Sequence, residues 1–270
     1  MILKCKDIIS LIEQEAPLFL QESYDNSGLQ WGNPENEVEK VLVCLDFTQE
    51  ALKAAIDNGV QLVISHHPIL FEPLKSINTG IGKGAMLFDC IQNNITVYAS
   101  HTNFDVADNG LNQYLADAFE LQNIIGLKNY YNHYNRQLVK HEYSLGRVGN
   151  LKEKLKVDEF ISLIKQRLDI PNVRVIGKRN NDEIQNVAVF CGSFDGDIEV
   201  LKEKKVDALI TGDLKYHIAL ALEEIDILTV DAGHYHTEKP FIKVISDMLK
   251  SNFKDVIIIE HYGNDIFSFR

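Results

Sequence analysis

The sequence predicts an α/β protein built from two similar lobes. Short β-branched apolar runs alternate with amphipathic segments of helical spacing, and this plan occurs in the first half and again in the second half. Strands that alternate with helices are typical of βαβ units and of a largely parallel sheet. In such sheets functional residues gather in loops beyond the carboxyl ends of the strands. The residues that follow each predicted strand are therefore the candidates for a functional site.

The first half contains an amphipathic helix and three buried strands. The helix is expected within residues 1–20, and a polar, glycine-punctuated loop follows at residues 22–32. The strands are expected at residues 40–44, 61–65 and 95–100. After the first strand, Asp46 and Gln49 resemble a capping box that begins a helix, and Gly59 is expected to end that helix.

The second half repeats this plan. Its strands are expected at residues 186–191, 207–210 and 227–231. Its helices are expected at residues 197–204 and 214–224, and Pro240 stands where a further helix commonly begins.

The two halves align in a register that indicates an internal duplication. Residues 59–66 match residues 205–212, and residues 97–101 match residues 230–234. The same register pairs His101 with His234 and Asp105 with Glu238, so both halves carry His-x-x-x-carboxylate after a strand. The alternative is a chance similarity between βαβ units.

The predicted organisation has three segments. Residues 1–125 form a first α/β lobe with the His-His and HTNFD motifs, and residues 181–270 form a second lobe with the TGD and GHYHTE motifs. Residues 126–180 form a connecting strand-helix-strand segment, in which His133 is expected to be a surface histidine. In this prediction, a terminal segment of one lobe can belong to the fold of the other lobe.

Composition and charge exclude several functional classes. The net charge is −12, from 27 basic and 39 acidic residues, which opposes nucleic-acid binding. Lys152 to Lys156 is a local basic run that we expect to be a solvated face. No stretch has the roughly 20 apolar residues that cross a bilayer, and the amino terminus lacks a secretory pattern. The four cysteines form no CxxC pair, which indicates a cytoplasmic, reducing location.

Histidines and carboxylates after the strands predict a metal site. The histidines that directly follow predicted strands are His66, His67, His101 and His234. Each alone is more often a hydrogen-bonded core residue than a ligand, so the prediction depends on their joint occurrence. Imidazole and carboxylate together suit zinc, iron, manganese or nickel. An adjacent histidine pair can send its rings to different ions, because successive side chains diverge. We therefore predict two divalent ions per chain, about 3.5–4 Å apart as in many metallohydrolases.

Five segments together carry a family resemblance. They are Tyr24 to Gln30, Ser65 to Pro68, His101 to Asp105, Thr211 to Asp213 with His217, and Asp231 to His234 with Glu238. Over nearly its whole length the chain resembles the GTP cyclohydrolase I type 2 homologue family, the NIF-three-like proteins. The combination of segments is specific to this family, whereas no single segment is.

The resemblance implies a dinuclear metal site in a central cleft between the lobes. The implied ligands are His66, His67, Asp105, His234 and Glu238. Glu238 is implied as the bridge, and His101 as a catalytic proton carrier or a residue that supports the ligands. The resemblance also implies a ring-shaped homohexamer whose metal sites face an inner cavity. This chain has the compact form without the domain that some members carry mid-chain.

Three functions are compatible with such a site. The leading hypothesis is a metal-dependent hydrolase in which an activated water attacks C8 of GTP. No glycine-rich phosphate loop of the P-loop or dinucleotide type is visible in the sequence. The second hypothesis is a dinuclear-metal phosphoesterase, and the third is a non-catalytic metal-binding or regulatory ring.

Several further residues have two readings each. Asp25 and Asn26 either anchor a substrate or form a turn, and His217 faces either the cleft or solvent. Thr211 and Asp213 are expected to cap the following helix. The remaining expectations place His236 away from the ions and Cys191 in the core.

Overall fold

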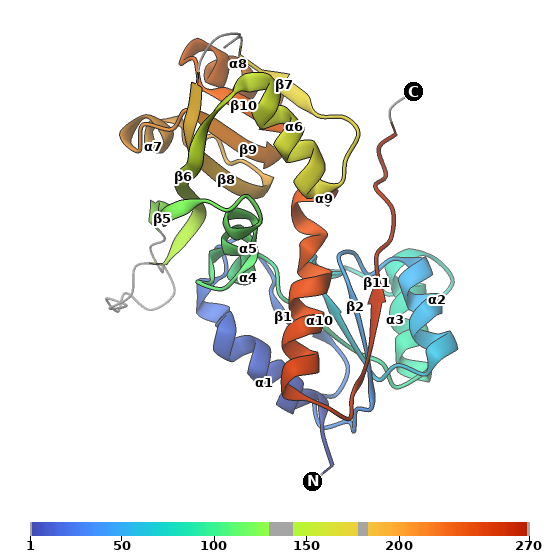
Figure 1. Cartoon of the computed structure of the whole chain (residues 1–270). Helices are drawn as coiled ribbons and strands as arrows, with labels where there is room; N and C mark the ends of the chain where they lie inside the picture. The colour runs from blue at the N-terminus through green and yellow to red at the C-terminus, as the bar shows by residue number, and fades with distance from the viewer. Residues whose placement is uncertain (1, 130–142, 178–182, 269–270) are drawn as a thin grey trace. The chain divides into compact units, whose positions relative to one another are not determined.

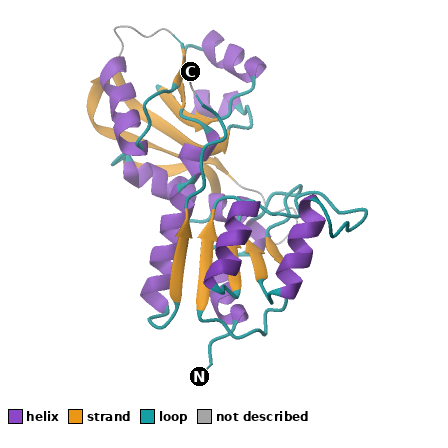
Figure 2. Ribbon diagram, turned by 90° about the vertical axis from the view of Figure 1, so that its right-hand side faces the viewer, coloured by secondary structure: helices purple, strands orange, loops and turns teal. Residues whose placement is uncertain are grey.

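The computed structural model describes residues 2–129, 143–177 and 183–268, so His133 lies outside the described residues. The chain forms two compact units. The first comprises Met1–Ala107 and Phe241–Asn264, and the second comprises Asp108–Pro240 and Asp265–Arg270. In each unit the strands gather in one sheet with helices packed against it (Figure 2). The predicted α/β class is therefore confirmed.

The sheet of the first unit has five strands in the order β1-β4-β3-β2-β11. They are β1 (Gly28–Trp31), β2 (Lys40–Cys44), β3 (Leu62–Ser65), β4 (Thr96–Ala99) and β11 (Ile257–His261). Four are parallel, and β1 pairs antiparallel with β4. Strands β2, β3 and β4 confirm the predicted runs. Strand β1 lies inside the segment predicted as a loop, where its pairing with β4 satisfies backbone groups that the sequence pattern leaves unassigned.

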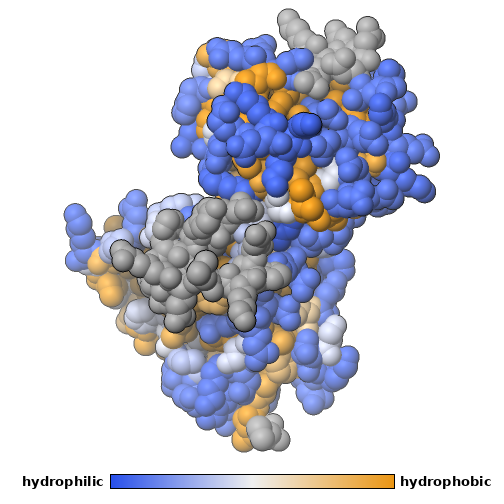
Figure 3. Space-filling view, turned by 90° about the vertical axis from the view of Figure 1, so that its left-hand side faces the viewer, coloured by the Kyte–Doolittle hydropathy of each residue, from blue (hydrophilic) through white to orange (hydrophobic). Residues whose placement is uncertain are grey.

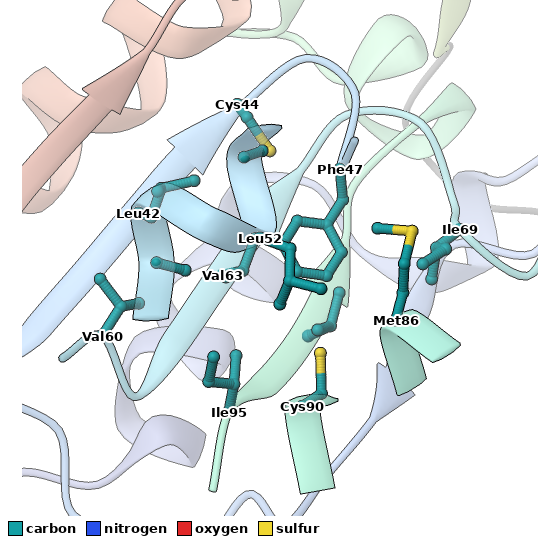
Figure 4. Packing of buried hydrophobic residues seen from close by; sticks show 13 residues of the cluster. Leu42, Cys44, Phe47, Leu52, Val60, Val63, Ile69, Met86, Cys90 and Ile95 are labelled. Atoms are coloured by element: carbon teal, nitrogen blue, oxygen red, sulfur yellow. The ribbon is translucent and has the colours of Figure 1, made fainter. Parts of the chain in front are cut away.

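Helices cover both faces of this sheet. They are α1 (Cys5–Glu15), the 3-10 turn η1 (Leu18–Leu20), α2 (Gln49–Asn58), α3 (Gly82–Gln92), α4 (Thr102–Val106) and α10 (Pro240–Asn252). Helices α2 and α3 lie on one face and α1 and α10 on the other (Figure 1). Against α2 and α3, the strand residues Leu42 and Val63 pack with Leu52, Met86 and Cys90 (Figure 4). Each buried side chain of leucine or valine size contributes about 1.5–3 kcal/mol.

Helix α2 begins differently from the prediction. Its N-cap is Thr48, whose Oγ1 accepts a hydrogen bond of 3.2 Å from the Ala51 amide. The capping box expected from Asp46 and Gln49 is therefore wrong, because Gln49 is already the first helical residue. Gly59 ends the helix in the left-handed conformation, at φ 64°, as predicted.

The sheet of the second unit has six strands in the order β5-β6-β8-β9-β10-β7. They are β5 (Gln122–Asn129), β6 (Ser144–Lys156), β7 (Arg174–Ile176), β8 (Glu183–Ser193), β9 (Ala208–Gly212) and β10 (Leu228–Asp231). Strands β8, β9 and β10 are parallel, and the other three pair antiparallel. The segment 126–180, predicted as a connection, supplies β6 and β7 to this sheet.

The helices of the second unit are α5 (Leu111–Ala118), α6 (Val157–Leu168), α7 (Ile198–Glu203), α8 (Tyr216–Glu224) and α9 (His234–Glu238). Helices α7 and α8 lie within the predicted ranges, and α6 is the helix of the predicted strand-helix-strand segment, whereas α5 and α9 were not predicted. Helix α10 begins at Pro240, as the sequence predicts.

The two sheets share one order of connections, which supports an internal duplication. In each, a helix precedes an antiparallel edge strand, and three parallel strands then alternate with helices: α1-β1-β2-α2-β3-α3-β4-α4 and α6-β7-β8-α7-β9-α8-β10-α9. The predicted register needs a correction at its end. Helix α4 begins after His101, whereas α9 begins after Gly233, so His101 corresponds to Gly233 rather than to His234.

Among the described residues, hydrophilic ones occupy most of the face shown in Figure 3. In the basic run of β6, Lys154 and Lys156 lie 3.1 and 4.0 Å from the Glu183 carboxylate. All four cysteines are buried. Among the described residues, no helix combines the length and the hydropathy needed to span a membrane.

Candidate metal centre

His66 follows β3 and is fully buried. Its Nδ1 lies 2.9 Å from the Ser100 carbonyl oxygen. A carbonyl can only accept, so in the neutral ring Nδ1 carries the hydrogen and Nε2 carries the lone pair. This is how metal-binding histidines are usually held, with the second ring nitrogen bonded to an oxygen.

His67 is held in the same way by a carboxylate. Its Nδ1 lies 2.8 Å from Oδ1 of Asp46, which follows the neighbouring parallel strand β2. This role of Asp46 was not predicted, because its spacing from Gln49 indicated a helix cap. Its position after β2 could have indicated that Asp46 lies near His67, because the carboxyl ends of adjacent parallel strands meet at one edge of the sheet.

His101 is the third histidine held through Nδ1, here 2.8 Å from Oδ1 of Asp25. The Asp25 side chain is fully buried, and it also accepts hydrogen bonds from Ser27 Oγ at 2.8 Å and from the amide and hydroxyl of Thr102. Burial alone would raise the pKa of Asp25, but the bonds from His101, Thr102 and Ser27 together lower it well below its usual range. The carboxylate therefore stays ionised and fixes the proton of His101 on Nδ1.

The three rings converge on one point in the first unit. One ring nitrogen from each of His66, His67 and His101 lies within 4.8 Å of the others. Asp105 is also buried, and its Oδ1 lies 3.7 Å from His66 Nε2. That separation is too long for a hydrogen bond and suits two donors of one ion, each about 2.1 Å from it. This set of nitrogen and oxygen donors fits a divalent transition metal.

An apolar wall supports this cluster from the core. The ring of Phe241, at the start of α10, lies 4.9 Å from the His66 ring. Phe104 packs edge-on against Phe241 at 5.3 Å. Both phenylalanines are buried, so the His66 ring is fixed by packing as well as by its hydrogen bond.

The second unit brings together His234 and Glu238. They lie four residues apart on α9, and His234 Nε2 is 3.0 Å from Glu238 Oε2. Residues at this spacing share one face of a helix. The other His234 nitrogen, Nδ1, lies 3.5 Å from Asp213 Oδ2. Glu238 is buried, so its carboxylate needs compensating donors or a cation.

A glycine makes room for the Glu238 carboxylate. Gly192, at the end of β8, has φ +60°, and a Cβ on it would lie 2.2 Å from Glu238 Oε1. The Gly192 amide donates to Thr237 Oγ1 at 3.1 Å, and its carbonyl accepts from Thr211 Oγ1 at 3.0 Å. The expectation that Thr211 caps a helix is therefore wrong, because its hydroxyl joins β9 to β8.

The comparisons with known proteins identify the family of the chain. Residues 3–265 match the family described as Duf34/NIF3 (NGG1p interacting factor 3). The chain belongs to the Duf34/NIF3 family.

Two relatives within this family are close in length to the chain. A Clostridium perfringens protein named "GTP cyclohydrolase 1 type 2 homolog" is 33% identical over 269 residues, covering 99% of this chain and 100% of the relative. A Helicobacter pylori protein named "GTP cyclohydrolase 1 type 2" is 31% identical over 264 residues, covering 97% of each. The crystal structure of a Bacillus cereus protein related to NIF3 has a TM-score of 0.88 and 27% identity, covering 100% of this chain and 99% of that one.

The remaining candidates from the sequence are Asn26, Asp213, His217 and Cys191. Asn26 Nδ2 donates to the Leu70 carbonyl at 2.8 Å, which places this side chain between two loops. Asp213 does not cap α8, whose N-cap is Lys215. His217 is exposed on α8, and Cys191 is buried as expected.

Two aspartates order the loop that carries the second-unit motif. Asp231 was not identified from the sequence as an organising residue. It is buried, pairs with Arg174, and accepts from the amides of Asp213, Leu214 and Gly233. Asp265 Oδ2 lies 3.2 Å from His236 Nε2. The pKa of His236 is lowered, mainly by burial and then by Lys239, with Asp265 acting in the opposite direction.

Proposed function

We propose that this Duf34/NIF3 chain is a metal-dependent hydrolase with two divalent ions per chain. The proposed ligands are His66, His67, Asp105, His234 and Glu238, with Glu238 as the bridge. The observation that carries the proposal is the convergence of three histidines whose Nδ1 atoms are each bonded to an oxygen. Such pairing prepares the opposite ring nitrogens for metal or proton chemistry.

When bound, the ions would supply Lewis acidity and lower the pKa of a water so that it attacks near neutral pH. His101 is the residue we assign to proton transfer. Asp25 holds its Nδ1 proton, so Nε2 is the atom that accepts a proton and later returns it. Zinc, iron, manganese and nickel all suit the nitrogen and oxygen donors of this set.

The proposed substrate is GTP, with hydrolysis at C8 of the guanine ring. This assignment is supported by the names of the Clostridium perfringens and Helicobacter pylori relatives. A cyclohydrolase reaction requires an activated water and proton transfer to the opening ring. The proposed ions and His101 supply these two functions.

The test is turnover of GTP by purified protein of known metal content. His101→Ala should lower kcat about 100-fold or more while the bound metal is retained, because general acid–base groups contribute about 10²–10⁴-fold. His217→Ala, which changes an exposed histidine on α8, is the matched control and should have wild-type kcat.

Three other outcomes would redirect the proposal. Protein that keeps both ions and leaves GTP unchanged removes this substrate. Hydrolysis of phosphodiesters in a parallel panel indicates a phosphoesterase instead. Cellular function that survives His101→Ala, and fails only when metal or assembly is lost, indicates a non-catalytic metal-binding ring.

We also propose that the chain works in the cytoplasm as a ring-shaped homohexamer, as the family resemblance implies. Light scattering on the purified protein should give six times the chain mass of 30.7 kDa. A monomeric mass at micromolar concentration would contradict the ring.

A further inference from the structure

Three rings form a row at the edge of the histidine cluster in the first unit. Tyr24 and Phe71 lie 6.4 Å apart between ring centroids, at an interplanar angle of 57°. The Phe71 ring lies 6.1 Å from the His101 ring, edge-on at 77°. These distances fall in the range of direct aromatic contact. The row therefore runs from exposed aromatic surface to the proposed proton carrier.

The two aromatic residues of this row are exposed, unlike the phenylalanines behind His66. Tyr24 has 64% of its surface exposed and Phe71 has 43%, whereas Phe104 has 2% and Phe241 has 0%. Exposed aromatic surface forgoes the free energy that burial of a large ring supplies. A ligand that covers Tyr24 and Phe71 would recover part of it.

The exposed pair is held by polar contacts between two loops. The carbonyl of Leu70, the residue before Phe71, accepts a hydrogen bond from Asn26 Nδ2 at 2.8 Å. The amide of Leu70 donates to Gln30 Oε1 at 3.2 Å. Gln30 is 7% exposed, and its Nε2 donates to the Asn26 carbonyl at 2.6 Å. On the other side, Tyr24 precedes Asp25, which is bonded to His101. These contacts restrain the backbone beside both rings before any ligand arrives, which lowers the entropic cost of binding.

We infer that Tyr24 and Phe71 form a stacking wall for the planar heterocyclic ring of the substrate and present that ring to His101. The inference rests on the proposed function, in which His101 moves protons at the reacting ring. Aromatic side chains stack on every nucleobase, so the wall selects a flat ring and leaves the choice of base to other groups. The stacking wall has no proposed role in binding phosphate.

The test is ligand binding by metal-loaded full-length protein, measured by calorimetry. The probes are GTP, ATP and a pterin, with ribose 5-triphosphate as the analogue that lacks a ring. Phe71→Ala should weaken binding of the ring-bearing probes about tenfold, within the range known for stacking on one aromatic side chain. Phe71→Tyr should retain the wild-type affinity because it keeps the ring.

Ile81→Ala is the matched control, since Ile81 lies with Phe71 in the connection between β3 and α3 and is 71% exposed. It should bind all probes like the wild type. Ribose 5-triphosphate should bind weakly and equally to the wild type and to Phe71→Ala. Both variants should keep the wild-type metal content and molecular mass.

Four results would overturn the stacking wall. They are unchanged GTP affinity in Phe71→Ala, an equal loss for the ring-free analogue, a change of assembly mass in Phe71→Ala, and no binding of any ring-bearing probe by the wild type. The third result would assign Phe71 to an interface between copies. Failure of the proposed function gives a different result. If GTP binds through Phe71 but is never hydrolysed, the hydrolase proposal is wrong and the stacking wall is retained.

Discussion

The first and second units each carry His-x-x-x-carboxylate after the last of three parallel strands, but the side chains are arranged differently. In the first unit His101 precedes α4 and is bonded to Asp25, while Asp105 lies beside His66. In the second unit His234 is the first residue of α9, and it contacts Glu238 one turn later. Equal spacing has thus produced one separated pair and one adjacent pair.

The difference comes from where each helix begins. One residue along an α-helix turns a side chain by about 100°. His101 is the N-cap of its helix, at φ −109° and ψ −109°, so its direction is set by the loop and by Asp25. His234 is already helical, so its direction is set by α9. A sequence motif fixes which groups are available, and the helix start decides which of them face each other.

The largest expected effect tests whether both motifs bind metal. Asp105→Ala and Glu238→Ala should each lower metal affinity by at least about 100-fold, the upper range for loss of mere supporting residues. Metal content after dialysis, measured by mass spectrometry, checks this. Glu224→Ala, on the exposed face of α8, is the control. If one variant kept both ions, the two motifs would differ in function as well as geometry.

The next largest effect concerns the space that Gly192 leaves for the Glu238 carboxylate in the second motif. Gly192 and Gly59 have φ +60° and +64°, but only at Gly192 would a Cβ meet Glu238; at Gly59 nothing lies within 4 Å. Gly59→Ala should cost about 1–2 kcal/mol for the left-handed backbone. Gly192→Ala should cost about 1–3 kcal/mol more through overpacking, and should also weaken metal binding. Urea unfolding of the metal-free variants gives both values, and equal costs would show that Glu238 moves aside freely.

The smallest effect concerns Asp25, the carboxylate bonded to Nδ1 of His101 in the first motif. Because the folded pKa of Asp25 is lowered, its ionised form stabilises the fold above the unfolded pKa of about 3.9, and this contribution is lost as pH falls below that value. Asp25→Asn should lower the free energy of unfolding by about 1.5–3 kcal/mol at pH 7. It should also flatten the dependence of that free energy on pH between pH 5 and 3. Urea unfolding across this range measures it.

Asp213→Asn is the control for this change, since Asp213 lies 3.5 Å from His234 and its side chain is 60% exposed. It should change stability by less than about 0.5 kcal/mol. Wild-type protein and Asp25→Asn with parallel pH curves would mean that an ionised Asp25 does not hold His101.

Sequence reasoning predicted the elements whose pattern is local. The strands β2, β3 and β4 and their counterparts β8, β9 and β10 are β-branched apolar runs, which read as buried strands without further information. Strand β1 was missed because four residues in a polar loop become a strand only by pairing with β4. The pairing of β11 with β2 depends on tertiary contact, which no local pattern contains.

For the site, residue type and position after a strand were sufficient to bring His66, His67 and Asp105 together as candidates. The partners of the histidines were harder. Asp46 and Asp25 are far from His67 and His101 in sequence, and an aspartate after a strand or in a loop is more often a cap or a turn residue. The one-residue shift between His101 and His234 was also invisible, since it depends on where the helices begin.

The order of the chain has a consequence for how this protein folds during synthesis. The second unit interrupts the first, so Phe241–Asn264, with most of α10 and β11, is made only after Asp108–Pro240 has emerged. Nascent domains fold as they become complete, from the amino terminus onward. Here all the strands of the second unit's sheet are made before β11, while β2 has an unpaired edge until β11 is made. Exposed strand edges invite aggregation, so slow translation near the carboxyl end should make this chain depend on chaperones.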